Sequence, residues 1–268
     1  MLVMLGGRSV LEIDAGRAAM KYLREAVDNM FKETEDVYLP FVEDELLTDL
    51  YEEQISGIPG TVDILLYRYS KADIWNLNNL FHEQLYPNVA ENLNDAYEGV
   101  LHYNLTKLSK NEREDIGRSV RLSCFSETPD NQLMWGHYAD GCRGICVEYN
   151  LCWLDDDTEA LKRLLPVHYT DAKKVKEKPT FIHYIEDDPC TSLFITKSNE
   201  WSYEKEWRII LPTSFDAVSP IPFKCASKVI LGAKMEDSMR EFVTMIVDNV
   251  NRKRGKDLPQ IIIEEQRL

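Results

Sequence analysis

The chain has 268 residues and a mass of 31.1 kDa, and 44% of its residues are hydrophobic. These values predict a folded protein with a substantial core and exclude a disordered chain. The 46 acidic residues outnumber the 31 basic ones, which leaves a formal net charge of −15. Because this charge repels phosphate backbones and anionic lipid surfaces, it argues against general binding to nucleic acids or membranes.

We expect no membrane anchor and no targeting segment from this sequence. No apolar run reaches the roughly 18 residues of a membrane span, and the start from Met1 to Gly6 is too short for a signal peptide. None of the cysteines forms a C-x-x-C pair, and the histidines show no metal-ligand spacing. We therefore expect a cytoplasmic protein with buried thiols and no metal cofactor.

Residues 1–60 are predicted to form an N-terminal helical arm. Apolar residues recur at helical spacing over Val10–Met30, and a second helical stretch follows at Val42–Tyr51. Gly57, Pro59 and Gly60 then break the pattern. Residues 61–268 are expected to form one α+β domain.

Short strands and helices alternate irregularly over residues 61–268. Strands are predicted at Asp63–Tyr69, Arg118–Ser126, Ile145–Tyr149, Leu165–Tyr169, Tyr203–Leu211, Lys228–Leu231 and Gln260–Glu264. Helices are predicted from a cap at Ser70 and Asp73 to about Leu85, after Ser109 and Glu112, after Asp130, and from Glu236 to about Asn251. This order favours a mixed, mainly antiparallel sheet with surrounding helices.

The segment from Trp201 to Arg208 carries the most informative charges. As a strand, it would place Glu204, Glu206 and Arg208 on one face. A buried face cannot hold these groups unpaired, so the face must be solvated, internally salt-bridged or part of a site. The simpler interpretation is an exposed strand whose Glu206 pairs with a neighbouring basic group.

Two further clusters could bind a ligand. Trp135, His137 and Tyr138 share a short helix before a glycine turn, where they could wall a pocket for a planar ring or belong to the core. Arg68, between Tyr67 and Tyr69, could hold a phosphate, or it could reach solvent or a carboxylate.

The order of these motifs resembles a known family. LLYRYS, NLNDAYE, SCFSE, MWGHYADGCRGICVEY, KSNEWSYEKEWRI and KVILG are similar to motifs of the bacterial domain-of-unknown-function family 2971 (DUF2971). The resemblance runs from about residue 63 to residue 250 and leaves the N-terminal arm outside. It identifies the family and says almost nothing about function.

The motif order is also similar to the Arg, Ser, Glu arrangement of ADP-ribosyltransferases. This resemblance implies an enzyme that consumes NAD, with Glu206 stabilising the ribosyl cation and Glu204 activating the acceptor. It implies that Arg68 holds the diphosphate, that Ser126 supports the ribose or the glutamate, and that Trp135 or Tyr138 stacks on the nicotinamide. Tyr67 and His137 complete the expected cofactor-binding residues. A macromolecular acceptor and a role in toxicity or phage defence would fit such an activity.

Two other functions remain open from the sequence. One is a binding or sensor module that recognises a nucleotide or peptide without catalysis. The other is a metal-assisted hydrolase that would recruit Asp95, Glu98, Glu204 and Glu206 to a divalent ion. Asn94, Asp95 and Glu98 could equally brace a loop through hydrogen bonds to the backbone.

Overall fold

The computed structural model describes residues 21, 24, 25, 64–89, 93, 118, 120–154, 163–170, 194–212, 220–256 and 258–267. The expected helices at Val42–Tyr51 and after Ser109 lie outside these residues, as does the arm helix apart from residues 21, 24 and 25. The chain divides into two compact units that are discontinuous in sequence. The first unit comprises residues 1–62, 87–124 and 157–219, and the second comprises 63–86, 125–156 and 220–268. The division into an arm and a single domain stays a prediction.

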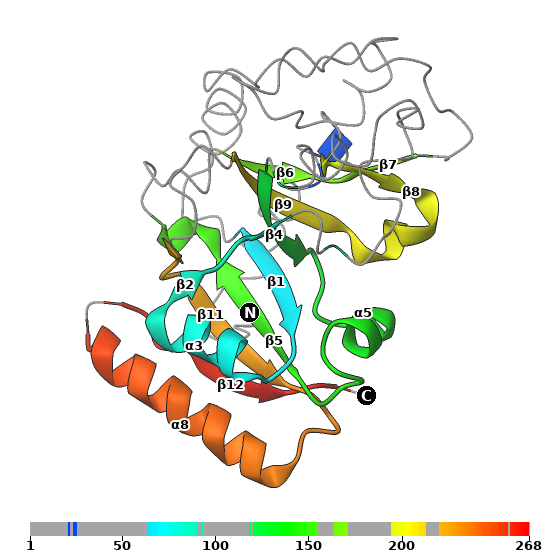
Figure 1. The fold of residues 1–268 in the computed structure, drawn as a ribbon. Helices are drawn as coiled ribbons and strands as arrows, with labels where there is room; N and C mark the ends of the chain where they lie inside the picture. Colours follow the sequence, from blue (N-terminus) through cyan, green and yellow to red (C-terminus); the bar gives the residue numbers. More distant parts are fainter. Residues whose placement is uncertain are drawn as a thin grey trace, which may run out of the picture. The chain divides into compact units, whose positions relative to one another are not determined.

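The second unit is built on a mainly antiparallel sheet (Figure 1). Strand β1 (Leu65–Ser70) and strand β11 (Ala226–Leu231) flank β5 (Ile145–Asn150), and both pair with it antiparallel. Strand β12 (Ile262–Glu265) joins β11 in the parallel direction. The end of β4 (Val120–Ser126) pairs with β1, and the boundary between the units falls within β4. The α+β class and the mixed, mainly antiparallel sheet are therefore confirmed.

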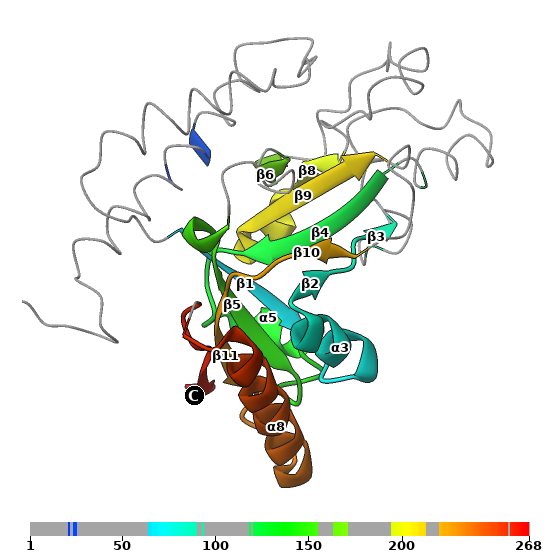
Figure 2. The same ribbon diagram turned by 90° about the vertical axis from the view of Figure 1, so that its left-hand side faces the viewer.

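Three helices of the described residues accompany this sheet. Helix α3 (Ile74–His82) and helix α8 (Asp237–Arg254) lie side by side on the sheet (Figures 1 and 2), and α5 (Gln132–His137) precedes β5. Helix α8 connects the parallel strands β11 and β12. The smaller elements of this unit are β2 (Gln84–Leu85), β10 (Ile221–Pro222) and the 3₁₀ helix η3 (Leu151–Trp153).

The core of the second unit combines aliphatic and aromatic side chains. All six residues of β5 are buried, and so are Val243, Ile246, Val247 and Val250 on one stripe of α8. The rings of Phe125, Tyr149 and Phe223 pack at centroid distances of 5.2–5.9 Å. Burial of these side chains supplies the main driving force for folding this unit.

The first unit combines one long strand with several short ones. Strand β9 (Glu206–Pro212) pairs with β6 (Leu164–Pro166) and neighbours β4, whose other edge takes β3 (Asn88–Val89). A separate parallel pair consists of β7 (His168–Thr170) and β8 (Thr196–Ser198), and the 3₁₀ helix η4 (Asn199–Glu204) follows β8.

The expected strand at Tyr203–Leu211 is wrong at its beginning. Residues up to Glu204 belong to η4, and Lys205 adopts a left-handed conformation with φ of 44° before β9 starts at Glu206. A left-handed residue ends a helix and redirects the chain, so the period of two cannot extend back to Glu204. The expected strand at Leu165–Tyr169 is likewise divided into β6 and β7.

The helix boundaries also differ from expectation. Asp73 alone caps α3, because its carboxylate accepts a hydrogen bond from the backbone N–H of Asn76. Helix α3 ends at Glu83, which is left-handed, so Leu85 enters β2 instead of continuing the helix. The cap of α5 is Asn131 and not Asp130, because Asn131 Oδ1 accepts hydrogen bonds from the backbone N–H groups of Leu133 and Met134.

Candidate functional site

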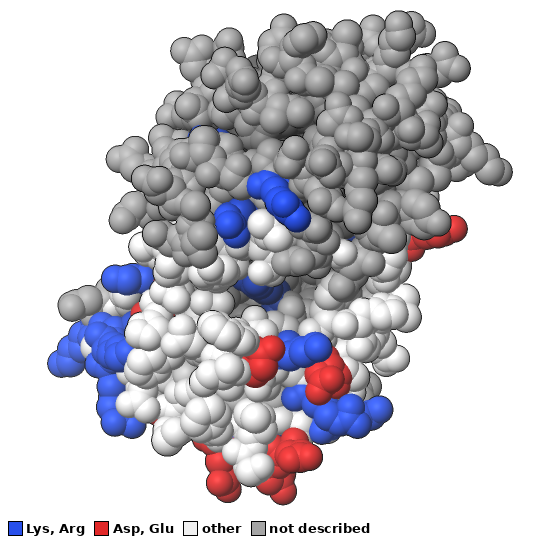
Figure 3. Space-filling model, in the orientation of Figure 1, with Lys and Arg blue, Asp and Glu red and all other residues white. Residues whose placement is uncertain are grey.

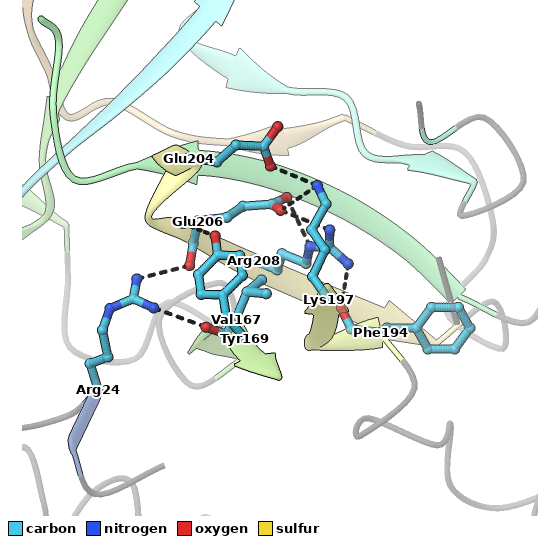
Figure 4. A network of polar contacts seen from close by, with 8 residues as sticks. All are labelled: Arg24, Val167, Tyr169, Phe194, Lys197, Glu204, Glu206 and Arg208. Carbon is cyan, nitrogen blue, oxygen red and sulfur yellow. Dashed lines mark hydrogen bonds and ion pairs between the residues drawn. The ribbon is translucent and has the colours of Figure 1, made fainter. Parts of the chain in front are cut away.

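The first unit holds a buried network of four charged side chains (Figure 4). Lys197 comes from β8, Glu204 from η4, and Glu206 and Arg208 from β9. All four side chains are buried. Two carboxylates and two cations make the network neutral, which is the condition under which charges can be kept away from water.

Glu206 is the centre of this network. Arg208 donates from Nε and Nη2 to the two Glu206 carboxylate oxygens, at 2.8 Å each. Lys197 Nζ donates to Glu206 Oε2 at 3.2 Å and to Glu204 Oε2 at 2.6 Å. Both oxygens of Glu206 therefore accept charge-assisted hydrogen bonds, and two of these form a bidentate pair with one guanidinium.

The pKa of Glu206 reflects a competition between burial and the two neighbouring cations. Burial alone would raise the pKa, but Arg208 and then Lys197 outweigh burial and lower it from 4.5 to about 2. The carboxylate is thus ionised at any physiological pH. An ionised group can stabilise a cation or accept a proton, but it cannot act as a general acid at neutral pH.

Arg24, a residue of the predicted arm, contacts the backbone around this network. Its guanidinium donates to the carbonyl oxygens of Val167 and Glu206, at 2.9 and 3.2 Å (Figure 4). It also lies over the rings of Tyr169 and Trp207, at 5.9 and 5.7 Å from their centroids. Such cation–π contacts stabilise a partly buried guanidinium.

The sequence anticipated part of this arrangement. Glu206 and Arg208 share a strand face, and the pairing of Glu206 with basic groups is confirmed. The expectation of an exposed strand is wrong, because Glu206 is 5% exposed and Arg208 is fully buried. Lys197 was missed, since nothing in the sequence indicates that β8 approaches β9. The catalytic roles of Glu204 and Glu206 stay predictions.

The second unit contains all six residues that were predicted to bind a cofactor: Tyr67, Arg68, Ser126, Trp135, His137 and Tyr138. The strand register places those on β1 and β4 on different faces of the sheet. Tyr67 lies opposite both Ser126 and Glu148, whereas Arg68 lies opposite Val147. Since adjacent strand residues point to opposite faces, Arg68 faces away from Tyr67 and Ser126. The sheet therefore does not bring these three side chains together on one face.

The face with Tyr67 carries a buried carboxylate that was not predicted as a site residue. The Tyr67 hydroxyl donates to Glu148 Oε2 at 3.1 Å, and Ser227 Oγ donates to Glu148 Oε1 at 2.6 Å. Lys228 Nζ lies 3.6 Å from Glu148 Oε2. A register shift between Ala226 and Lys228 brings Ser227 to this carboxylate. This cluster is internally paired, as a buried carboxylate requires.

Trp135 is a core residue. Its indole is 1% exposed, donates from Nε1 to the carbonyl of Pro129 at 2.7 Å, and meets the Tyr69 ring edge-on at 5.3 Å. A planar ligand could reach this indole only by displacing those contacts. His137 is exposed and Tyr138 is half-buried, with their ring centroids 6.3 Å apart, so these two rings are accessible.

A cavity of about 300 Å³ lies within the second unit, where three chain segments meet. It is lined by Lys71, Ala72, Asp73, Asp140, Arg143, Glu236 and Met239. Lys71 directly follows β1, and Arg143 belongs to the turn between α5 and β5. The cavity thus presents two cationic side chains and three carboxylates. One carboxylate, that of Asp73, is already engaged in capping α3.

The turn that carries Arg143 has little freedom. Asp140, Gly141 and Cys142 all have positive φ, and a Cβ at Gly144 would lie 2.2 Å from the carbonyl oxygen of Ser70. A side chain at position 144 would therefore collide with the backbone of β1. This close packing fixes the backbone of the turn beside the end of β1, which Lys71 follows.

Within the described ranges, no group of three or more His, Cys, Asp or Glu side chains could hold a metal ion. Asp95 and Glu98, which the metal-dependent alternative requires, lie outside those ranges. The helices of the described ranges include none that is both long and apolar enough to cross a membrane.

Comparison with protein families places part of the chain beside a described family. The family described as "Protein of unknown function (DUF2971)" matches residues 134–209, about a quarter of the chain. The resemblance to DUF2971 is therefore confirmed over a segment that includes the Arg143 turn, Glu148 and the buried charged network. No curated protein and no solved structure matches the chain.

Proposed function

We propose that the protein binds a nucleotide in the second-unit cavity between Lys71 and Arg143. The observation that carries this proposal is the cavity itself, which combines two cations with accessible carboxylates. Its volume of about 300 Å³ lies at the lower end of the roughly 300–1,000 Å³ found for ligand pockets. Such a site suits a nucleotide better than a polymeric nucleic acid, which the net charge of −15 repels.

The charges of the cavity match the two kinds of group on a nucleotide. The ammonium of Lys71 and the guanidinium of Arg143 would bind phosphate oxygens, the guanidinium through two parallel hydrogen bonds. Asp140 and Glu236 would accept hydrogen bonds from ribose hydroxyls or from an amino group of the base. A ligand with phosphate alone would face repulsion from these carboxylates, so the proposal requires a molecule that has both anionic and donor groups.

We further propose NAD as the nucleotide and its cleavage as the activity, in a bacterial cytoplasm and in toxicity or phage defence. The support is the similarity of the motif order to ADP-ribosyltransferases. Glu206 belongs to the first unit and does not line the cavity of the second unit, so its carboxylate is not part of the proposed nucleotide site. Its carboxylate oxygens are moreover held by Arg208 and Lys197.

Binding is tested by titrating the purified protein with NAD and with ADP-ribose in a calorimeter. We expect Lys71→Ala and Arg143→Ala each to weaken binding at least tenfold, since each removes a charged phosphate contact. Lys224→Ala is the matched control, because Lys224 is exposed and does not line the cavity. Equal affinities for the wild type and both cavity variants would refute this location.

Cleavage is tested separately by following free nicotinamide at saturating NAD. Release that Lys71→Ala and Arg143→Ala reduce, and that Lys224→Ala leaves unchanged, would support NAD cleavage at the cavity. Binding without release would leave the nucleotide-binding proposal intact and reject NAD consumption.

A further inference from the structure

Four large apolar side chains are exposed on neighbouring helices of the second unit. On α3, Ile74 is 69% and Trp75 is 77% exposed, and on α8, Phe242 is 40% and Met245 is 50% exposed. The two helices contact one another. Single exposed apolar residues are common, but a group of large ones on adjacent helices is typical of an interaction surface.

Charge is distributed unevenly along α8. The exposed acidic residues Asp237 and Glu241 lie in its first turns and a third, Asp248, lies past its middle, whereas the exposed basic residues Arg252 and Lys253 lie in the last turn and Lys256 follows it. Figure 3 shows the same order on the surface: basic atoms over the C-terminal end of α8, acidic atoms over its N-terminal end, and a broad uncharged area between them.

We propose that this face, formed by α3 and α8, binds the same face of a second copy of the chain. A two-fold axis across α8 makes the two α8 helices antiparallel, which brings the acidic end of one onto the basic end of the other. The apolar residues between these ends then meet their counterparts and leave water together. The surface is thus complementary to itself in both charge and hydrophobicity.

A second copy fits this face better than a partner of uniform charge. An acidic partner would be attracted to Lys253 and Arg252 but repelled by Glu241 and Asp237, and a basic partner would meet the reverse problem. The net charge of −15 keeps copies apart at long range, so a specific contact needs local pairing of opposite charges. The antiparallel arrangement of α8 supplies this pairing twice.

The proposal is tested by sedimentation equilibrium of the full chain over a range of protein concentrations. We expect a reversible monomer–dimer equilibrium that weakens at least tenfold in Trp75→Glu and in Met245→Glu. Leu133→Glu is the control, because Leu133 is 53% exposed but lies on α5. A monomeric wild type at all concentrations, or equal weakening by all three variants, would overturn the proposal.

Charge exchange tests the orientation. Glu241→Lys should weaken the dimer, because each basic end then faces a like charge. Adding Arg252→Glu to this variant should restore much of the affinity, since opposite charges again meet at both ends. A double variant that dimerises more weakly than Glu241→Lys would refute the antiparallel arrangement. Both residues are exposed, so circular dichroism and thermal unfolding should be unchanged in these variants.

Discussion

Substitution of Glu206 by glutamine should severely destabilise the first unit. Glutamine keeps the shape of the side chain but removes one negative charge from a neutral, buried group of four. Two buried cations would then remain with one carboxylate, that of Glu204, which contacts Lys197. Removing one partner from a buried ion pair costs about 3–5 kcal/mol, because a buried charge is left without compensation.

The pKa of Glu206 gives a second measure of the same loss. Its decrease from 4.5 to about 2 corresponds to about 3 kcal/mol of stability at neutral pH. The two values agree in magnitude. For a chain of this size, such a change lowers the melting temperature by roughly 6–20 °C.

Urea unfolding followed by circular dichroism measures this effect, with Glu200→Gln as an exposed control that should change stability by less than about 0.5 kcal/mol. A Glu206→Gln variant within about 1 kcal/mol of the wild type would refute the reasoning. In addition, Glu206→Leu combined with Arg208→Met should cost less than the sum of the single changes, by roughly 0.5–3 kcal/mol. Strict additivity would show that the pair is not coupled.

Three further outcomes are expected. Because the pKa of Glu206 is lowered on folding, its contribution to stability is complete above about pH 4.5 and is lost as the pH falls towards about 2. Urea unfolding of Glu206→Gln across this pH range should therefore lack this part of the pH dependence of stability. Gly144→Ala should destabilise the second unit by about 2 kcal/mol or more, on the order of other core overpacking, because the added Cβ would lie 2.2 Å from a backbone oxygen. Gly136→Ala is the control, since nothing lies near its Cβ, and it should leave the melting temperature unchanged or raise it. With a thiol reagent at pH 8, the exposed Cys152 should react far faster than Cys146, because burial and then Glu148 raise the pKa of the Cys146 thiol. Similar reaction rates of the two cysteines, measured by mass spectrometry, would contradict this prediction.

The sequence predicts those elements whose periodicity is local and regular. The apolar stripe of α8 and the strand β5 both appear at the predicted positions. By contrast, the sequence before Glu206 gave no indication of η4, because Lys205 adopts positive φ without the glycine or asparagine that usually marks such a position. A tertiary constraint, the ion pairing of Glu204 with Lys197, accompanies this local exception.

The candidate sites were predictable only in part. The period of two already implies that Tyr67 and Arg68 point to opposite faces, but which face holds Ser126 depends on strand register, which spacing along the chain does not reveal. Likewise, Lys71 and Arg143 are far apart in sequence, and only the fold brings them to the same cavity. Residue types indicated the chemistry, whereas tertiary pairing determined which residues meet.

The central claim, nucleotide binding in the second-unit cavity, is tested most directly by a crystal structure of the protein grown with NAD or ADP-ribose. The account predicts electron density for the diphosphate between the side chains of Lys71 and Arg143, with the ribose near Asp140 or Glu236. An ordered nucleotide at any other place, or an empty cavity at a ligand concentration that saturates the protein in solution, would contradict it.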